Sequence, residues 1–319
     1  MALLEVKNLK IYYPIGKKGL FSREEQKYVK AVDDVSFEVE EGTVLGIVGE
    51  SGCGKSSLAK GIMMLNPVLS GQILLNGVDL LSLNKRNLKK ERQNFQMIFQ
   101  DPEASLNPRL TVGEIIEEPL QVYKNLSKKE LRYKVQELME QVGLSPYMIR
   151  RYPHEFSGGQ RQRICIARSL SLNPKLIVCD EAVSALDVSI QSQIINLLNE
   201  LKDRLGLTYL FISHDLAVTR YISDQIMVMY LGKTVEFGKT EDVMLSPTHP
   251  YTKALISAVP QYKNEKEALM LEGEIPSPIN PPSGCPFNTR CPLVEEECSQ
   301  SMPDLSDEKY NQKVACFKV

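Results

Sequence analysis

Nine consecutive residues have the types and spacing of a phosphate-binding loop. The first eight fit the pattern G-x-x-x-x-G-K-S, and the nine are Gly49, Glu50, Ser51, Gly52, Cys53, Gly54, Lys55, Ser56 and Ser57. In this pattern the glycines let backbone N–H groups curl around phosphates, and the following helix presents its positive end to them. Lys55 is expected to reach the terminal phosphates, and the Ser56 hydroxyl to bind Mg²⁺. The pattern predicts a site for ATP or GTP.

Two carboxylates end a run of apolar residues much later in the chain. Residues 176–179 read as a buried strand, and Asp180 and Glu181 follow them. In proteins with a phosphate-binding loop a carboxylate at this place holds Mg²⁺, so Asp180 is the expected metal partner. Glu181 is placed to polarise an attacking water as general base, an effect worth about 10²- to 10⁴-fold in rate. The alternative, a solvated acidic pair, is disfavoured by the loop motif before it.

His214 follows another strand pattern, at residues 209–213, and precedes Asp215. A single histidine is more often structural than catalytic. However, the carboxyl ends of parallel strands form the edge at which such sheets bind ligands. We therefore favour a role for His214 in sensing the γ-phosphate.

A second pattern suited to an anion begins at Ser157. Ser157 is a good N-cap, Gly158 and Gly159 free the backbone, and residues from Gln160 to position 170 have a helical pattern. The start of a helix attracts negative charge. One nucleotide does not need two such sites from one chain, so this segment is expected to face a nucleotide held by another copy of the fold. A capped helix start without a ligand is the alternative.

The elements that must position these residues alternate between strand and helix. Strand patterns lie at 3–13, 32–39, 43–48, 96–99, 176–179, 209–212 and 225–230. Helix patterns lie at 55–65, 128–142, 160–170 and 190–205. The alternation favours parallel strands covered by helices on both faces. We expect an α/β fold with a mixed sheet core.

Two regions depart from this alternation. Residues 102–171 have helical patterns and few strand signals, which predicts a helical subdomain inserted in the sheet. After residue 246 the chain becomes rich in proline, which resists both helix and central strand. We therefore expect a nucleotide-binding domain at 1–246 and a C-terminal extension at 247–319. A polar insert at 16–27 is expected to be a surface loop.

The composition excludes several classes of protein. A formal charge of -2 gives no basic excess of the kind that nucleic-acid binders show. No apolar stretch reaches the roughly 18 to 20 residues that a membrane-spanning helix needs. The N-terminus lacks the pattern of a secretory signal, so we expect the chain to stay in the cytoplasm.

The cysteines fall into two groups. Cys53, Cys165 and Cys179 are expected to be small core or loop residues, whereas four others crowd the C-terminal end, namely Cys285, Cys291, Cys298 and Cys316. Their spacing matches neither the usual C-x₂-C zinc patterns nor a common ferredoxin pattern. Four thiolates nonetheless suit a [4Fe–4S] cluster or zinc, and free thiols are the third possibility.

The series of motifs resembles the nucleotide-binding subunit of an ATP-binding cassette transporter. In chain order the motifs are the phosphate-binding loop, Gln100 after a strand, Ser157-Gly158-Gly159-Gln160, Asp180-Glu181, Ser184-Ala185-Leu186-Asp187 and His214. The resemblance implies that Tyr13 stacks on adenine, although Tyr12 is adjacent. It also implies that Gln100 senses the γ-phosphate and Mg²⁺, and that Asp187 makes a contact across a dimer.

Further segments resemble the oligopeptide and dipeptide importer branch of that family. They are Gln100-Asp101-Pro102 with Ser105-Leu106-Asn107-Pro108-Arg109, the run SALDVSIQ at 184–191, and His249-Pro250-Tyr251-Thr252. The insert after Tyr13 resembles the F-type ATPase subunit, which pairs with a D-type subunit. Phe156 and Ala182 depart from the usual Leu and Pro. The resemblance implies a cluster in the C-terminal extension.

The branch implies an ATPase at the cytoplasmic face of the membrane that powers peptide import. Two membrane-spanning subunits and an external binding protein would then be separate polypeptides. A nickel importer of the same branch stays open, because such ATPase subunits do not touch the cargo. A non-transport ATPase of the superfamily would need long coiled-coil heptads or two cassettes in one chain, and the sequence has neither.

Overall fold

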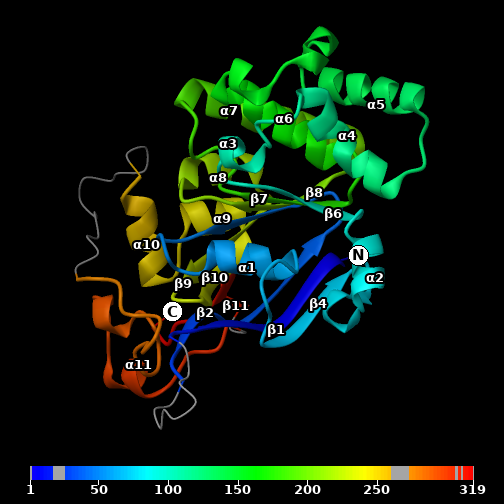
Figure 1. Ribbon diagram of the computed structural model, residues 1–319. Helices are drawn as coiled ribbons and strands as arrows, with labels where there is room; N and C mark the ends of the chain where they lie inside the picture. Colours follow the sequence, from blue (N-terminus) through cyan, green and yellow to red (C-terminus); the bar gives the residue numbers. More distant parts are fainter. Residues whose placement is uncertain (1, 17–25, 260–272, 306–307, 310–311, 319) are drawn as a thin grey trace. The chain divides into compact units, whose positions relative to one another are not determined.

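A computed structural model describes residues 2–16, 26–259, 273–305, 308–309 and 312–318 of the chain (Figure 1). The chain divides into two compact units. Unit 1 consists of Met1–Val39, Val44–Leu81 and Ile212–Val319, and unit 2 of Glu40–Thr43 and Ser82–Phe211. The phosphate-binding loop and the C-terminal extension thus belong to the same unit. The polar insert at 16–27 lies largely outside the described residues.

Unit 1 contains an antiparallel sheet with the strand order β2-β1-β4-β5. Its strands are β1 (Ala2–Pro14), β2 (Tyr28–Glu40), β4 (Ser70–Leu75) and β5 (Val78–Asp79). Strand β1 pairs with β4 from Leu4 opposite Leu75 onward and buries its alternate apolar residues. This confirms the two N-terminal strands expected from the sequence, whereas β4 and β5 were not predicted.

The other strands of unit 1 form a mixed arrangement in the order β11-β12-β10-β9-β3. They are β3 (Val44–Val48), β9 (Gln225–Tyr230), β10 (Lys233–Lys239), β11 (Glu308–Lys309) and β12 (Gln312–Val314). Strands β3 and β9 are parallel, while β10 is antiparallel to both β9 and β12. The expected mixed sheet is confirmed, and its antiparallel part comes from the C-terminal third of the chain.

Short helices complete unit 1. They are α1 (Lys55–Ile62), α8 (Leu216–Ile222), α9 (Thr240–Leu245), α10 (Pro250–Ser257) and α11 (Glu296–Gln300), with 3-10 turns at Leu80–Ser82 and Asn288–Arg290. Helix α8 packs closely on β3, since a Cβ on Gly46 would lie 2.4 Å from a methyl group of Thr219. Helix α1 begins where expected and ends at Ile62, three residues before the expected 65.

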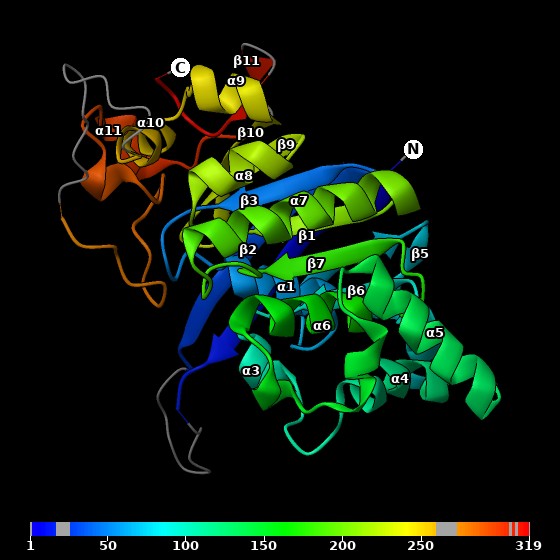
Figure 2. The same ribbon diagram turned by 90° about the horizontal axis from the view of Figure 1, so that it is seen from above.

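Unit 2 combines parallel strands with the predicted helical region (Figures 1 and 2). The strands, in the order β8-β7-β6, are β6 (Phe95–Ile98), β7 (Leu176–Asp180) and β8 (Thr208–Ile212). The helices are α2 (Lys85–Glu91), α3 (Pro102–Ser105), α4 (Val112–Tyr123), α5 (Lys128–Gln141), α6 (Gly158–Leu170) and α7 (Val188–Leu205), with 3-10 turns at Pro146–Arg150 and Pro153–Glu155.

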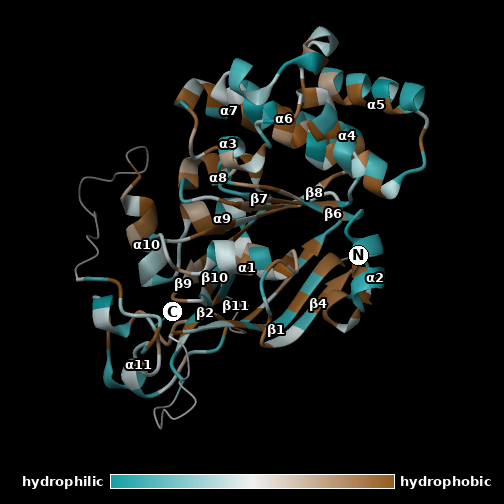
Figure 3. Cartoon of the chain, in the orientation of Figure 1, coloured by the Kyte–Doolittle hydropathy of each residue, from teal (hydrophilic) through white to brown (hydrophobic). Residues whose placement is uncertain are grey.

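Helix α5 illustrates why this region is helical. Ser127 and Glu130 form a capping box at its start, and its apolar residues recur every three or four positions. Figure 3 shows the resulting alternation of hydrophilic and hydrophobic patches along the helix. Leu131, Val135 and Leu138 are buried, as the sequence predicts.

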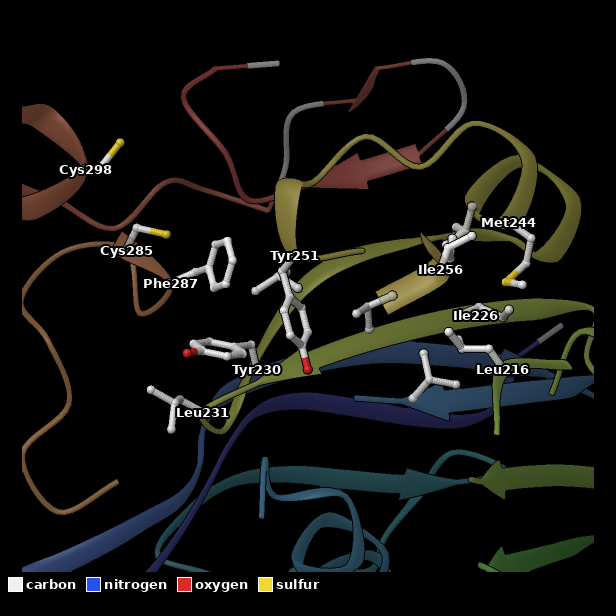
Figure 4. Packing of buried hydrophobic residues seen from close by; sticks show 14 residues of the cluster. Leu216, Ile226, Tyr230, Leu231, Met244, Tyr251, Ile256, Cys285, Phe287 and Cys298 are labelled. Carbon is white, nitrogen blue, oxygen red and sulfur yellow. The ribbon is translucent and has the colours of Figure 1, made fainter. Parts of the chain in front are cut away.

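The C-terminal extension packs into the hydrophobic core of unit 1 rather than standing apart from it. Tyr251 and Ile256 from α10, together with Phe287, belong to the same buried cluster as Tyr230 from β9 (Figure 4). Cys53, Cys165 and Cys179 are buried, as expected. Within the described residues, no helix is long and apolar enough to cross a membrane.

Candidate nucleotide-binding site

The phosphate-binding loop of unit 1 depends on glycines at its two ends. Gly49 and Gly54 have φ angles of 149° and 108°. A Cβ at these positions would lie 2.2 Å from the Met229 carbonyl oxygen and 2.0 Å from that of Ala31. Residues with a side chain cannot take this backbone path without strain. The loop is therefore held between β2 and the end of β9.

Lys55 turns back into the loop that precedes it. Its ammonium donates hydrogen bonds to the carbonyl oxygens of Gly49 (2.7 Å) and Glu50 (3.0 Å), and the residue is 4% exposed. Helix α1 begins at Lys55 without a side-chain cap on its first turn. Its first N–H groups have no partner within the helix and are suited to bind phosphate oxygens. The loop therefore combines the positive charge of Lys55 with the backbone donors at the start of α1.

Two residues that the sequence did not place at the loop contact Glu50. The Glu50 N–H donates to the Tyr251 hydroxyl over 2.8 Å. The Arg290 guanidinium donates to both carboxylate oxygens of Glu50, over 2.8 and 3.2 Å. Tyr251 lies in a motif that the sequence analysis singled out, but Arg290 follows Glu50 by 240 residues and no spacing pattern points to it.

Tyr12 and Tyr13 lie at the end of β1, where successive side chains point to opposite faces. The Tyr13 hydroxyl accepts a hydrogen bond of 2.7 Å from the Asn66 side chain, just beyond α1. The Tyr12 hydroxyl instead donates to Asp33 over 2.5 Å. Burial, together with this hydrogen bond, raises the pKa of Tyr12. Of the two, Tyr13 is thus the one whose hydroxyl reaches the end of the helix that follows the loop.

His214 is exposed at the start of the segment that leads into α8. The neighbouring Ser213 N–H donates to the carbonyl oxygen of Ile47, in the strand that leads into the loop. Asp215 caps α8 by accepting from the N–H groups of Ala217 and Val218. Unit 1 therefore brings His214 to the end of β3 from which the loop begins.

Unit 2 brings Gln100 and Glu181 together. Strands β6 and β7 pair in parallel from Phe95 opposite Leu176 to Ile98 opposite Cys179. The two strands thus end at the same edge, and the Gln100 amide donates to Glu181 over 2.8 Å. Asp180, the last residue of β7, is 4% exposed. Glu181 has a φ of 49°, a left-handed conformation that is uncommon outside glycine.

The signature segment, Ser157 to Gln160, forms the start of α6. The Ser157 hydroxyl accepts from the Gln160 N–H, and the Gln160 side chain accepts from the Ser157 N–H, which makes a capping box. A Cβ on Gly159 would lie 2.5 Å from a methyl group of Ile190, at the start of α7. Asp187, just before α7, is exposed and makes no cap with its side chain.

The four C-terminal cysteines lie in one part of unit 1, but not as a metal site. Burial, with smaller contributions from the other three thiols, raises the pKa of the Cys285 thiol to about 11. Among the described residues, no group of three or more His, Cys, Asp or Glu side chains is arranged to hold a metal ion. The expected cluster site is therefore not preformed in this arrangement, because Cys285 and Cys298 pack into the hydrophobic cluster.

Comparison with known proteins places these motifs in a family. The ABC transporter model matches residues 32–184, and the model of the oligopeptide/dipeptide transporter C-terminal region matches residues 235–298. The oligopeptide transport ATP-binding protein OppF of Salmonella typhimurium is 52% identical, over 99% of this chain and 96% of its own length. This chain belongs to the ABC transporter family.

Other ABC transporter proteins show similar agreement. The dipeptide transport ATP-binding protein DppF of Haemophilus influenzae is 50% identical over 99% of this chain and 97% of its own length. Among solved structures, the ATP-binding cassette MJ0796, described as a dimer bound to ADP and phosphate, is 30% identical with a TM-score of 0.65. The match covers 74% of this chain and 98% of the MJ0796 chain. The P-loop α/β fold expected from the sequence is thus confirmed.

Proposed function

We propose that this chain hydrolyses ATP to power the import of peptides across the cytoplasmic membrane. One observation carries the proposal: the relatives named for oligopeptide and dipeptide transport are about half identical over nearly the whole chain, including its C-terminal region. The phosphate-binding loop and the Gln100–Glu181 contact supply groups suited to the chemistry.

The ATP-binding residues are proposed to be Tyr13 and the loop from Gly49 to Ser57. Tyr13 stacks on the adenine, while the loop N–H groups and the Lys55 ammonium bind the phosphates. In the structure this ammonium donates to two loop carbonyls, an arrangement that phosphate oxygens can replace without leaving the charge unpaired.

Mg²⁺ is proposed to be held by oxygen atoms of Ser56, Gln100 and Asp180. These donors suit Mg²⁺, which binds through one or two carboxylates together with substrate phosphates. When bound, the ion neutralises charge on the phosphates. Glu181 accepts a proton from the attacking water, and Gln100 and His214 sense the γ-phosphate. The hydrogen bond from Gln100 supports this assignment, since it orients the Glu181 carboxylate.

Pairing with a homologous D-type subunit is proposed to complete the ATP site. The signature segment, Ser157, Gly158, Gly159 and Gln160, then faces the ATP of the partner, and Asp187 contacts the partner. Ser157 and Gly158, at the start of α6, are exposed, and so is Asp187. The solved cassette MJ0796 is described as a dimer bound to ADP and phosphate, which also supports pairing.

The complete transporter is proposed to include two membrane-spanning permease subunits and an external substrate-binding protein. This chain then lies at the cytoplasmic face of the membrane as a peripheral subunit. We propose a cassette domain at 1–246, with a helical subdomain at about 102–171, and an importer-specific extension at 247–319.

The four C-terminal cysteines are proposed as the ligands of a [4Fe–4S] cluster. The support is that Cys285, Cys298 and Cys291 lie in or against one hydrophobic cluster, and that the Cys285 N–H donates to the Cys298 carbonyl oxygen over 2.8 Å. Their arrangement in the structure does not form the site, so binding requires their side chains to turn toward a common centre. Zinc and free thiols are the competing outcomes of the test.

Uptake by cells tests which solute the transporter carries. A strain that lacks this chain is compared with the same strain carrying the wild-type gene or the Lys55→Ala variant, using a radiolabelled tripeptide and radioactive nickel. The proposal expects tripeptide uptake only with the wild-type gene, and nickel uptake that is the same in all three. Loss of nickel uptake alone would assign the chain to a nickel importer instead.

A further inference from the structure

The C-terminal extension contacts the phosphate-binding loop through a partly buried ion pair. Arg290 and Glu50 form a two-pronged salt bridge, with N–O distances of 2.8 and 3.2 Å. The Arg290 side chain is 5% exposed and that of Glu50 is 24% exposed. A guanidinium fork that meets a carboxylate in this way fixes orientation as well as distance. The pair therefore restrains the second residue of the loop.

Tyrosines on both sides hold the pair in place. The Arg290 guanidinium also donates to the Tyr230 hydroxyl over 3.3 Å and lies 5.9 Å from the centre of that ring. The Tyr251 hydroxyl accepts from the Glu50 N–H over 2.8 Å. Both the backbone and the side chain of Glu50 are thus bound by residues outside the loop.

The segment that carries Arg290 is itself firmly packed. Phe287 lies with its ring centre 5.3 Å from that of Tyr230 and 5.4 Å from that of Tyr251. The Arg290 N–H donates to the Phe287 carbonyl oxygen over 3.0 Å, which closes a short turn. Figure 4 shows Phe287 between Cys285 and Tyr251. The position of Arg290 therefore depends on the packing of residues 285–291.

We propose that Arg290 and Tyr251 are positioning residues that hold Glu50, and with it the phosphate-binding loop, in the shape that receives ATP. The inference rests on the proposed ATP site at this loop. It assigns to the segment 285–291 a new role, which is to set the affinity of the chain for ATP.

The composition of the loop explains why such support matters. Gly49, Gly52 and Gly54 all have positive φ angles, and glycine loses more conformational freedom on ordering than any other residue. A loop that is already ordered loses less entropy when it binds phosphates. Glu50 is the point of support because its carbonyl oxygen also accepts from Lys55.

A purely structural role makes a different prediction. If the ion pair only docks the extension, its loss lowers the stability of unit 1 and the fraction of folded protein. The affinity of the folded fraction for ATP then stays the same. Affinity and stability must therefore be measured on the same variants.

The test measures the dissociation constant of fluorescent methylanthraniloyl-ATP with the full chain, and the melting temperature by circular dichroism. Arg290→Met removes the charge, and Arg290→Lys keeps the charge but loses the fork. Tyr251→Phe removes only the hydroxyl that accepts from Glu50. The matched control is Arg220→Met, since Arg220 forms a similar two-pronged pair with Glu241, with distances of 3.2 and 2.9 Å, away from the loop.

We expect the dissociation constant to rise about tenfold in Arg290→Met, because the loss of a hydrogen bond to a charged group lowers affinity by about tenfold or more. Smaller rises are expected in Arg290→Lys and Tyr251→Phe, and none in Arg220→Met. Adding Glu50→Gln to Arg290→Met should cause little further loss, because the two groups act together.

Unchanged affinity in folded Arg290→Met overturns the inference. If that variant does not fold, unchanged affinity in both Arg290→Lys and Tyr251→Phe overturns it equally. The Lys55→Ala variant distinguishes failure of the positioning role from failure of the proposed ATP site. ATP binding that survives Lys55→Ala would refute the site itself, whereas loss of binding in Lys55→Ala with normal binding in the Arg290 variants would refute only the positioning role.

Discussion

The side-chain amide of Gln100 donates a hydrogen bond of 2.8 Å to the carboxylate of Glu181. The parallel register of β6 and β7 produces this contact, because both strands end at the same edge of unit 2. The hydrogen bond orients the carboxylate that we propose as general base. A change at Gln100 is thereby linked directly to the proposed base.

Replacement of that base gives the first prediction. Glu181→Gln keeps the size of the side chain but removes its ability to accept a proton, so ATP hydrolysis should fall by about 10²- to 10⁴-fold. ATP binding should persist and favour the paired state, which size-exclusion chromatography with the partner subunit detects. Glu200→Gln, at a 68% exposed position on α7, is the matched control. A Glu181→Gln transporter that still turns over ATP normally would exclude Glu181 as the base.

The signature segment gives the second prediction. Ser157→Ala should abolish hydrolysis at the phosphate-binding loop of the partner, while this chain's own loop continues to work. Ser127→Ala is a close control, because both serine hydroxyls accept a 3.4 Å hydrogen bond in a capping box. Each change should cost about 1 kcal/mol of helix stability. Single-turnover ATP hydrolysis is measured in complexes of this chain with its partner in which only one of the two phosphate-binding loops is intact. The complex that fails to hydrolyse ATP shows which loop is affected. A defect at this chain's own loop would contradict the assignment.

A buried histidine predicts how stability depends on pH. Burial lowers the pKa of His249 from 6.5 to about 3, so the folded chain keeps it neutral, whereas the unfolded chain binds a proton below about pH 6.5. The unfolded state then holds more protons, and this contribution to stability is lost as pH falls from 6.5 toward 3. The loss between pH 7 and pH 5.5 should be on the order of 1 kcal/mol.

The His249→Asn variant isolates this effect. His249 caps α10 by accepting from the Tyr251 N–H, and asparagine can cap in the same way without titrating. Urea unfolding at the two pH values should show a larger loss for the wild type than for the variant. Both proteins contain the other titratable groups, so the contributions of these groups to the loss of stability cancel in the comparison. One such group is the buried Glu236, since burial raises its pKa. Equal losses in the two proteins would contradict the prediction.

The cysteine proposal is tested by metal content. Protein purified without oxygen should be brown and contain about four iron atoms per chain, as a [4Fe–4S] cluster requires. Cys285→Ser and Cys298→Ser should each lose the colour, whereas Cys179→Ser should keep it because that buried cysteine lies in β7. Colourless protein with zinc, or with no metal, would rule out the cluster.

Local patterns in the sequence predicted what neighbouring residues determine. The phosphate-binding loop, helix α5 and the capped start of α6 all follow from residues within a few positions of one another. Contacts between distant segments were harder to predict. The strand pattern at 176–179 pointed to Glu181 and the resemblance pointed to Gln100, but only the structure, through the β6–β7 register, shows that the two residues touch.

Other features left no signal in the sequence. Strand β10 was not predicted, and its pairing with β12 joins the C-terminal extension to unit 1. The contact between Arg290 and Glu50 joins residues that lie 240 positions apart, so no local pattern could reveal it. For the four C-terminal cysteines the sequence suggested more than the structure contains. Their number and proximity predicted a metal site, but the described residues do not form one in advance.

The most direct test of the proposed function is ATP-driven peptide uptake by proteoliposomes that contain the complete transporter with this chain. We predict that a radiolabelled peptide accumulates when ATP is supplied on the side of this chain, and that Lys55→Ala abolishes the accumulation. Uptake that is as fast with Lys55→Ala as with the wild type, or that proceeds without ATP, would contradict the proposal that this chain powers import.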